Sequence, residues 1–519
     1  MPVAELTVEP ESTNAKKSSF DQIDDYSKHG KDQGVKDQGV YVAGPSRTVL
    51  GASAWSMAGY GFSQCFRLVN NMVLSYLLMP EAFGTMAIVN LVVVGISMFS
   101  DVGAGPCIIQ NERGDHFELL NTAWVIGIFR GIVITFIAAL LAMPVASFYD
   151  LPELVWLIPL ASLTALINGT ASTAIYTSQR HLDLKSLAWL DIRSQVIGSI
   201  AMCILAFYWP TVMSLVLGTI ATAVAHTIFS HRMISGYRNR FAFSRTDAKK
   251  LFHFGRWIFV STLMMFAAMQ VDRMMMGKLF DIGTLGVYSF GLAIAMLPRM
   301  VVEKLSSGIL YPVLSRFARG SSDGLMPQLR SARGSILAVG AAMVISVFVT
   351  CQDFFEFLYH EDYHAAGSIC QWLCLSAWVA MLTMTLSPAL VAMGKTKEVA
   401  NSNFVKLPAT IIASLFGFHT AGLSGFILGL SIGSLIAHLV VIDALAKIGM
   451  LLIKQDLVTT FVVVLAMVFV VFVQNAETIS KTEMRVAFAF VAISFWALAG
   501  IQVRRYRDEE RSIASDPLA

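Results

Sequence analysis

A pair of charged residues, Asp272 and Arg273, interrupts an apolar run that extends from Trp257 to Phe280. An Arg or an Asp near the centre of a membrane-spanning helix costs about 2.5–3.5 kcal/mol on insertion scales, so such charges face a polar or water-filled interior and not lipid. The two residues are adjacent and point about 100° apart on a helix, so each needs a partner of its own. The forked donors of Arg suit an anionic group such as phosphate.

A polar stripe runs along the first long apolar segment. Ser63, Arg67, Asn70 and Asn71 are spaced i, i+4, i+7 and i+8, which places them on one face of a helix. A lone Asn in such a helix can hold two helices together, whereas a stripe that contains an Arg is more typical of a cavity lining. We therefore predict that Arg67, Asn70 and Asn71 bind an anionic, polar substrate.

Two further segments carry charges among apolar residues. Arg130 lies between Gly127 and Gly131, and we take it as another candidate for substrate binding. Arg299 and Glu303 are spaced i, i+4 just after Pro298, which is expected to kink the helix. Cavity lining and a structural ion pair are equally good interpretations of Arg299 and Glu303.

Three acidic residues are candidates for charge balance or for binding a coupling cation: Asp101, Asp272 and Glu303. Asp191, Arg193 and Lys406 are weaker candidates, because they lie nearer to helix ends from which their side chains could reach the membrane surface.

No motif in the chain predicts enzymatic activity, a cofactor or a metal site. His360 to His364 fits the H-E-x-x-H pattern of zinc proteases, but it lies in a short connection without a third ligand. Phosphate-binding glycine loops and catalytic triads are not evident. The six cysteines form no C-x-x-C pair, and most lie in or beside apolar segments, so disulfides are not implied.

The composition is that of a membrane protein. Of the 519 residues, 55% are hydrophobic and 14% are charged, whereas soluble domains average about 25% charged residues. Fourteen apolar segments are long enough to span a bilayer. They are residues 48–78, 82–104, 118–148, 153–176, 186–208, 211–231, 252–279, 284–311, 330–358, 365–392, 398–417, 421–446, 455–474 and 483–503.

The distribution of Lys and Arg predicts which connections face the cytoplasm. With the N-terminus inside, the outer connections hold only Lys278 and Lys481. The inner connections and the C-terminal tail hold Arg113, Arg180, Lys185, Arg232, Arg238, Arg240, Arg245, Lys249, Lys250, Arg316, Arg319, Arg330, Arg333, Lys395, Lys397, Lys447, Lys454, Arg504, Arg505, Arg507 and Arg511. Both termini are therefore expected in the cytoplasm, and the outer connections are too short to fold into domains.

A weak internal repeat suggests the domain organisation. Asn70–Gly84 and Asp272–Gly286 both begin with a polar doublet and end in glycine, and the same offset aligns Asp101 with Glu303. We predict an N-lobe (47–236, six helices), a C-lobe (247–449, six helices) and two further helices (450–503). Residues 1–46, polar and with a tandem KDQGV, are expected to form a disordered cytoplasmic tail, and residues 504–519 a second cytoplasmic tail.

Short motifs give the chain a family resemblance. They include Phe254-Gly255, Asp272-Arg273, Leu285 to Ser289 and Tyr311 to Arg316, together with Leu77 to Gly84, Ser100 to Gly103 and Ile108 to Gln110. In these motifs the chain resembles the Wzx-type oligosaccharide flippases, a polysaccharide transporter family. The same superfamily contains the MATE multidrug antiporters and the lipid II flippase.

The resemblance implies an all-α, MATE-like fold of two helical lobes around a cavity that opens alternately to each side. It implies transport of an undecaprenyl-diphosphate-linked oligosaccharide across the bacterial inner membrane for exopolysaccharide, capsule or O-antigen synthesis. H⁺ or Na⁺ would be the coupling ion, a polysaccharide polymerase and export machinery would be partners, and no nucleic acid would bind. The alternatives are a cation-coupled multidrug antiporter and a membrane-embedded polysaccharide polymerase, although the short outer loops disfavour a polymerase.

Overall fold

The computed structural model describes residues 49–100, 103–234, 237–245, 248, 266–310, 325–447, 449–450, 452–476 and 480–514. In these ranges the chain is helical and contains no strand. The all-α membrane fold predicted from the sequence is therefore confirmed. The expected tail (residues 1–46) and the candidate Asp101 lie outside the described residues.

The N-terminal helices, here called the N-half, are connected by short turns. They are α2 (Val49–Ser75), α3 (Pro80–Phe99), α4 (Ala104–Gln110), α5 (Phe117–Tyr149), α6 (Leu154–Gly169), α7 (Ala174–Arg180), α8 (Leu184–Tyr208) and α9 (Val212–Ser230).

The helices between residues 266 and 446 are called the C-half, and two helices follow them. The C-half begins with a helix at 266–279. It continues with α11 (Ile282–Ala295), α12 (Leu297–Leu305), the π-helix η1 (Ser306–Leu310), α14 (Leu325–Leu358), the 3₁₀ turn η2 (Glu361–Tyr363), α15 (Ala365–Ala392) and α16 (Thr396–Ala446). The last two helices are α17 (Ile453–Gln474) and α18 (Lys481–Ala514).

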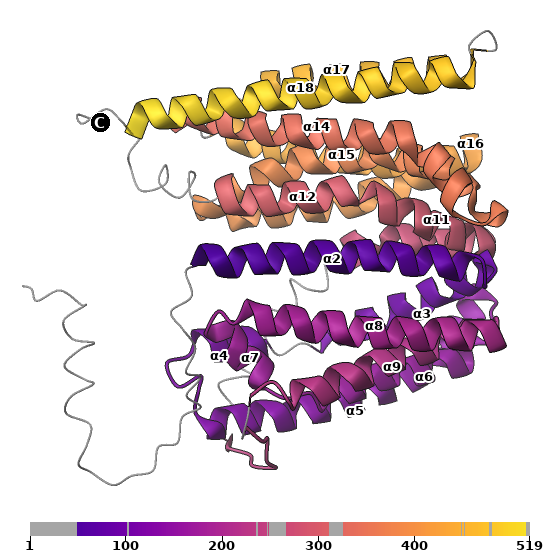
Figure 1. Cartoon of the computed structure of the whole chain (residues 1–519), viewed down its shortest axis with the longest axis vertical. Coiled ribbons are helices and arrows are strands. Elements are labelled where there is room, and N and C mark those ends of the chain that lie inside the picture. The colour runs from indigo at the N-terminus through magenta and orange to yellow at the C-terminus, as the bar shows by residue number, and fades with distance from the viewer. Residues whose placement is uncertain are drawn as a thin grey trace, which may run out of the picture.

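Figure 1 shows these helices running roughly parallel, with α2 between α8 of the N-half and α12 of the C-half. Helices α17 and α18 lie along α14 at the edge of the C-half. Ten described helices are long and apolar enough to cross a membrane, or eleven if α6 and α7 form one bent span. The predicted count of fourteen is not confirmed, in part because the predicted segment 252–279 is described only from residue 266.

Several helix boundaries differ from the prediction or refine it. Helix α16 leaves helical geometry at Ala421 and Gly422, where Gly422 has a φ of 61°, and so divides close to the predicted gap between two segments. The predicted segment 153–176 ends earlier, because α6 stops at Gly169 and α7 continues at an angle of 61°. Side chains stabilise this break: Ser230 Oγ accepts a hydrogen bond from the backbone N–H of Ser172.

Helix α18 extends to Ala514, eleven residues beyond its predicted end at Val503. The added segment is rich in Arg and Glu, which are strong helix formers and can be solvated where the helix leaves the membrane. Part of the expected C-terminal tail is therefore helical.

The N-half and the C-half touch closely at the end where α3 and α11 begin. Helices α3 and α11 cross so closely that a Cβ atom on Gly84 would overlap the carbonyl oxygen of Ile282, and one on Gly286 that of Pro80. The buried Tyr363 donates a hydrogen bond to the carbonyl oxygen of Leu78 at 2.7 Å.

A buried ion pair attaches α17 to the C-half. Arg333 of α14 is fully buried and donates to Asp456 of α17 at 2.5 Å, and also to Thr385 of α15 at 3.1 Å. His438 of α16 lies 3.3 Å from the other carboxylate oxygen of Asp456. From the sequence we expect Arg333 in a cytoplasmic connection, whereas it lies inside the helical bundle.

Candidate functional site

A charged cavity of about 480 Å³ lies between α2 and the C-half. Its walls come from α2, the helix at 266–279, α11, α12, α15 and α16. Seven of its side chains are charged or carry an amide discussed above: Arg67, Asn71, Asp272, Arg273, Arg299, Glu303 and Lys406. Residues that are more than 300 positions apart in the sequence therefore meet in one place.

The four cations of this cavity form no ion pair with any carboxylate in the described part of the chain. Arg67 donates to Gln64 Oε1, and Arg273 donates to Gln270 Oε1 at 2.8 Å. Arg299 makes a long contact of 3.9 Å with the sulfur of Met296, and no described ion pair joins it to Glu303. Four cations and two acidic side chains leave the cavity with an excess of positive charge.

Asp272 has one satisfied oxygen and one free oxygen. Tyr288 of α11 donates to Asp272 Oδ2 at 2.8 Å. Its Oδ1 is buried and has no hydrogen-bond partner among the described residues. A buried carboxylate oxygen without a donor is costly unless a cation or a proton is nearby.

Lys406 is a stronger candidate than its position in the sequence indicates. Its position ten residues into α16 allowed its ammonium group to reach the membrane surface, but the side chain lines the charged cavity instead. The signal that could have identified it is a Lys within an apolar helix, in a chain whose other apolar helices also carry charged residues.

Asn70 and Arg130 do not line the charged cavity. Asn70 faces α8, where its side-chain oxygen lies 3.7 Å from the sulfur of Cys203. Arg130 donates to the carbonyl oxygen of Ser97 at 2.7 Å and to the hydroxyl of Ser100 at 3.1 Å. It lines a second cavity, of about 840 Å³, which lies inside the N-half.

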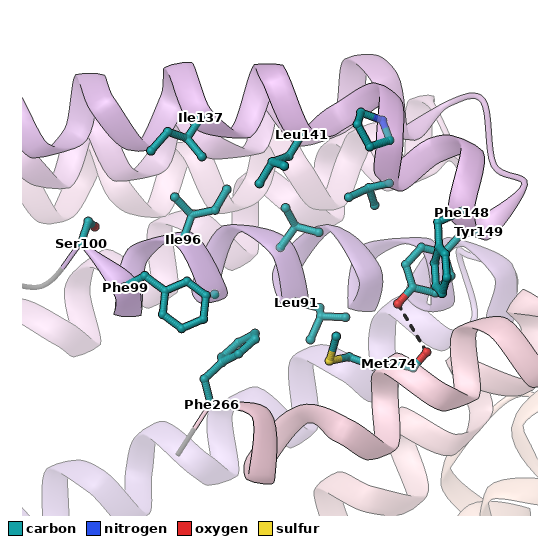
Figure 2. Close-up of a pocket in the computed structure, with 14 residues that line it drawn as sticks. Leu91, Ile96, Phe99, Ser100, Ile137, Leu141, Phe148, Tyr149, Phe266 and Met274 are labelled. Atoms are coloured by element: carbon teal, nitrogen blue, oxygen red, sulfur yellow. Dashed lines mark hydrogen bonds between the residues drawn. The ribbon is translucent and has the colours of Figure 1, made fainter. Parts of the chain in front are cut away.

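An apolar pocket of about 720 Å³ lies between the two halves, near α3 and α5. Figure 2 shows Leu91, Ile96 and Phe99 of α3 facing Phe266 and Met274 of the C-half. Tyr149 closes one end by donating to the carbonyl oxygen of Met274 at 3.3 Å. Because its walls are almost entirely hydrocarbon, this pocket suits neither a phosphate nor a sugar.

The sequence of residues 73–368 matches the family described as "Polysaccharide biosynthesis protein". The chain belongs to this family. The matched region includes α3 to α14 and contains the acidic and basic residues of the charged cavity except for Arg67 and Lys406.

The relatives with which the chain can be aligned are distant in sequence. The chain is 20% identical over 372 residues to an "Uncharacterized membrane protein in cps region" from Klebsiella pneumoniae, covering 70% of this chain and 76% of that protein. It is 21% identical to the "Teichuronic acid biosynthesis protein TuaB" from Bacillus subtilis, covering 57% and 61%. It is 19% identical to the "Succinoglycan biosynthesis transport protein ExoT" from Rhizobium meliloti, covering 72% and 75%.

Solved structures show the same fold. The lipid II flippase MurJ in an inward closed conformation matches with a TM-score of 0.65 at 12% identity, covering 88% of this chain and 99% of that one. An inward-facing multidrug transporter of the MATE family matches with a TM-score of 0.55 at 16% identity, covering 73% and 92%. At such low identity the likeness shows the fold alone, which is MurJ- and MATE-like.

Proposed function

We propose that this protein flips undecaprenyl-diphosphate-linked oligosaccharide repeat units across the bacterial inner membrane for the synthesis of an exopolysaccharide, a capsule or an O-antigen. The observation that carries the proposal is the charged cavity, in which Arg67, Arg273 and Arg299 have no carboxylate partner among the described residues. A diphosphate carries the complementary charge, and Arg binds phosphate through several N–H groups at once. The family supports a role in polysaccharide synthesis.

The same charge pattern disfavours a multidrug antiporter. Cationic drugs are bound best by cavities in which acidic side chains predominate, whereas here Arg and Lys outnumber Asp and Glu. A lipid-linked anion fits the cavity better than an organic cation.

Transport would proceed by alternating access between the N-half and the C-half, acting as the two lobes. The close crossing of α3 and α11 would close the outer end, while the charged cavity would open toward the cytoplasm. Rocking of one lobe against the other would break this crossing and expose the cavity to the outside. Asp272, Glu303 and Asp101 remain candidates for charge balance or for binding H⁺ or Na⁺, and the free oxygen of Asp272 supports its assignment.

The variant Gly286→Val is expected to open the outer end. Its side chain would collide with the carbonyl oxygen of Pro80, so the closed crossing of α3 and α11 would be destabilised. The measurement is the labelling of Ser289→Cys, which lines the charged cavity, by an impermeant thiol reagent added from outside in a cysteine-free background. We expect labelling to increase several-fold.

The control is Gly61→Val, since a Cβ atom at Gly61 meets nothing within 4 Å. This variant should leave the labelling unchanged. Equal labelling of Ser289→Cys with and without Gly286→Val would contradict the proposed closure.

The function itself is tested by deleting the gene. The expected result is loss of surface polymer and accumulation of lipid-linked repeat units on the inner leaflet. Efflux of ethidium should not change. A deletion strain without such accumulation would exclude the flippase, and loss of ethidium efflux would favour the antiporter.

A further inference from the structure

The N-half cavity has a chemistry different from that of the charged cavity. Its volume is about 840 Å³, and neutral amides from three helices line it: Asn90 of α3, Asn168 of α6 and Gln195 of α8. Asn90 and Asn168 are exposed although they lie in apolar helices. Neither side-chain amide has a hydrogen-bond partner in the described part of the chain, so each offers free donors and acceptors to a ligand.

Aromatic side chains form another part of the wall. Trp124 of α5 and Tyr176 of α7 line the cavity. Trp124 donates its indole N–H to the carbonyl oxygen of Thr170 at 3.0 Å, which holds the ring in place. A fixed aromatic ring provides a flat apolar surface against which a C–H-rich ligand face can pack.

Charge is sparse in this cavity. The guanidinium of Arg130 is held by Ser97 and Ser100. Asp191 and His226 lie 3.7 Å apart, and His226 Nδ1 is buried without a partner among the described residues. The ligand that matches free amides, fixed aromatic rings and few charges is a neutral polyhydroxylated molecule with apolar faces, which is the chemistry of a sugar.

The two cavities adjoin along α2. Ser63 lines the N-half cavity and donates to Gln195 Oε1 at 2.6 Å, whereas Arg67, one helical turn further on, lines the charged cavity. Four residues of a helix correspond to a rise of about 6 Å. One extended ligand can therefore place its anionic group at Arg67 and the sugar units that follow this group at Ser63 and beyond.

We propose that the N-half cavity binds the sugar residues of the lipid-linked oligosaccharide, while the charged cavity binds the diphosphate. This assignment rests on the proposed function and divides the substrate between two sites. Under this assignment the N-half selects among different oligosaccharides. The charged cavity recognises the diphosphate, which all such lipid-linked substrates share.

Binding of two separate ligands to the full-length protein in nanodiscs tests the assignment. One ligand is the lipid-free oligosaccharide released from the polymer of the host strain, and the other is undecaprenyl diphosphate. The double variant Asn90→Leu with Asn168→Leu keeps the branching and the number of heavy atoms of each side chain and removes two hydrogen-bonding groups. We expect it to weaken oligosaccharide binding about tenfold and to leave undecaprenyl diphosphate binding within about twofold of the wild type.

The matched variant is Arg273→Gln, which should weaken undecaprenyl diphosphate binding and spare the oligosaccharide. Unchanged oligosaccharide binding in the double variant would overturn the assignment and leave the proposed function intact. A wild-type protein that binds neither ligand would overturn both. If the double variant loses both ligands through misfolding, the single variants Asn90→Leu and Asn168→Leu decide by the same criterion.

Discussion

Replacing Arg273 with Ala is expected to abolish polymer export while the protein remains in the membrane. Arg273 lines the charged cavity, and in the described structure its guanidinium is held only by the neutral side chain of Gln270. A hydrogen bond to a charged group contributes about 1.5–3 kcal/mol, which corresponds to a roughly 10- to 150-fold loss of affinity for the diphosphate. Arg67→Ala should have the same effect. Export is measured as surface polymer per cell at equal amounts of membrane-inserted protein.

Arg193→Ala provides a matched control. Arg193 also lies in a membrane-spanning helix, but it is exposed, lines neither of the two polar cavities, and sits 5.6 Å from the ring centre of Trp189. Its loss should leave export near the wild-type level. Normal export by both Arg67→Ala and Arg273→Ala would show that these cations do not bind the substrate.

The second large effect is expected for Asp456→Ala, which should destabilise the fold. Asp456 is the carboxylate that pairs with the fully buried Arg333. Removing one member of a buried ion pair leaves the other charge without compensation and costs about 3–5 kcal/mol. The thermal unfolding midpoint of the purified protein in detergent should fall by several degrees, with α17 released from α14.

Two variants separate this interpretation from a general sensitivity to mutation. Asp353→Ala removes the partner of Arg485 in an exposed pair, which should cost at most about 1 kcal/mol. Replacing both buried partners, Arg333→Met with Asp456→Leu, should restore much of the stability lost in Asp456→Ala. An Asp456→Ala protein as stable as Asp353→Ala would contradict the proposed importance of the buried pair.

The fold class could be predicted from the sequence because the bilayer imposes a strong and local constraint. Each apolar segment has to be long enough to span the membrane and helical enough to satisfy its own backbone. The break in α16 lies next to a predicted gap for the same reason. The bend between α6 and α7 was missed because it is stabilised by Ser230, a side chain from another helix.

The site could be predicted only in part. The i, i+4 spacing identified Arg67 as lining a cavity, but it could not decide between the adjacent Asn70 and Asn71, which point about 100° apart. Asn71 lines the charged cavity and Asn70 contacts α8. The surroundings of Lys406 and Arg333 could not be predicted from the sequence. Tertiary contacts decide whether a charged side chain near a helix end reaches solvent or lies inside the protein. The partner of Arg333 is 123 residues away.

The most direct test is a flipping measurement with the purified protein in proteoliposomes that contain the lipid-linked repeat unit of the host strain. An enzyme added outside modifies only the sugars on the outer leaflet. We predict that the wild-type protein makes the inner-leaflet pool accessible within minutes, and that Arg273→Ala leaves about half of the lipid protected, as in protein-free vesicles. Equal protection with and without the wild-type protein would contradict the proposed flippase activity.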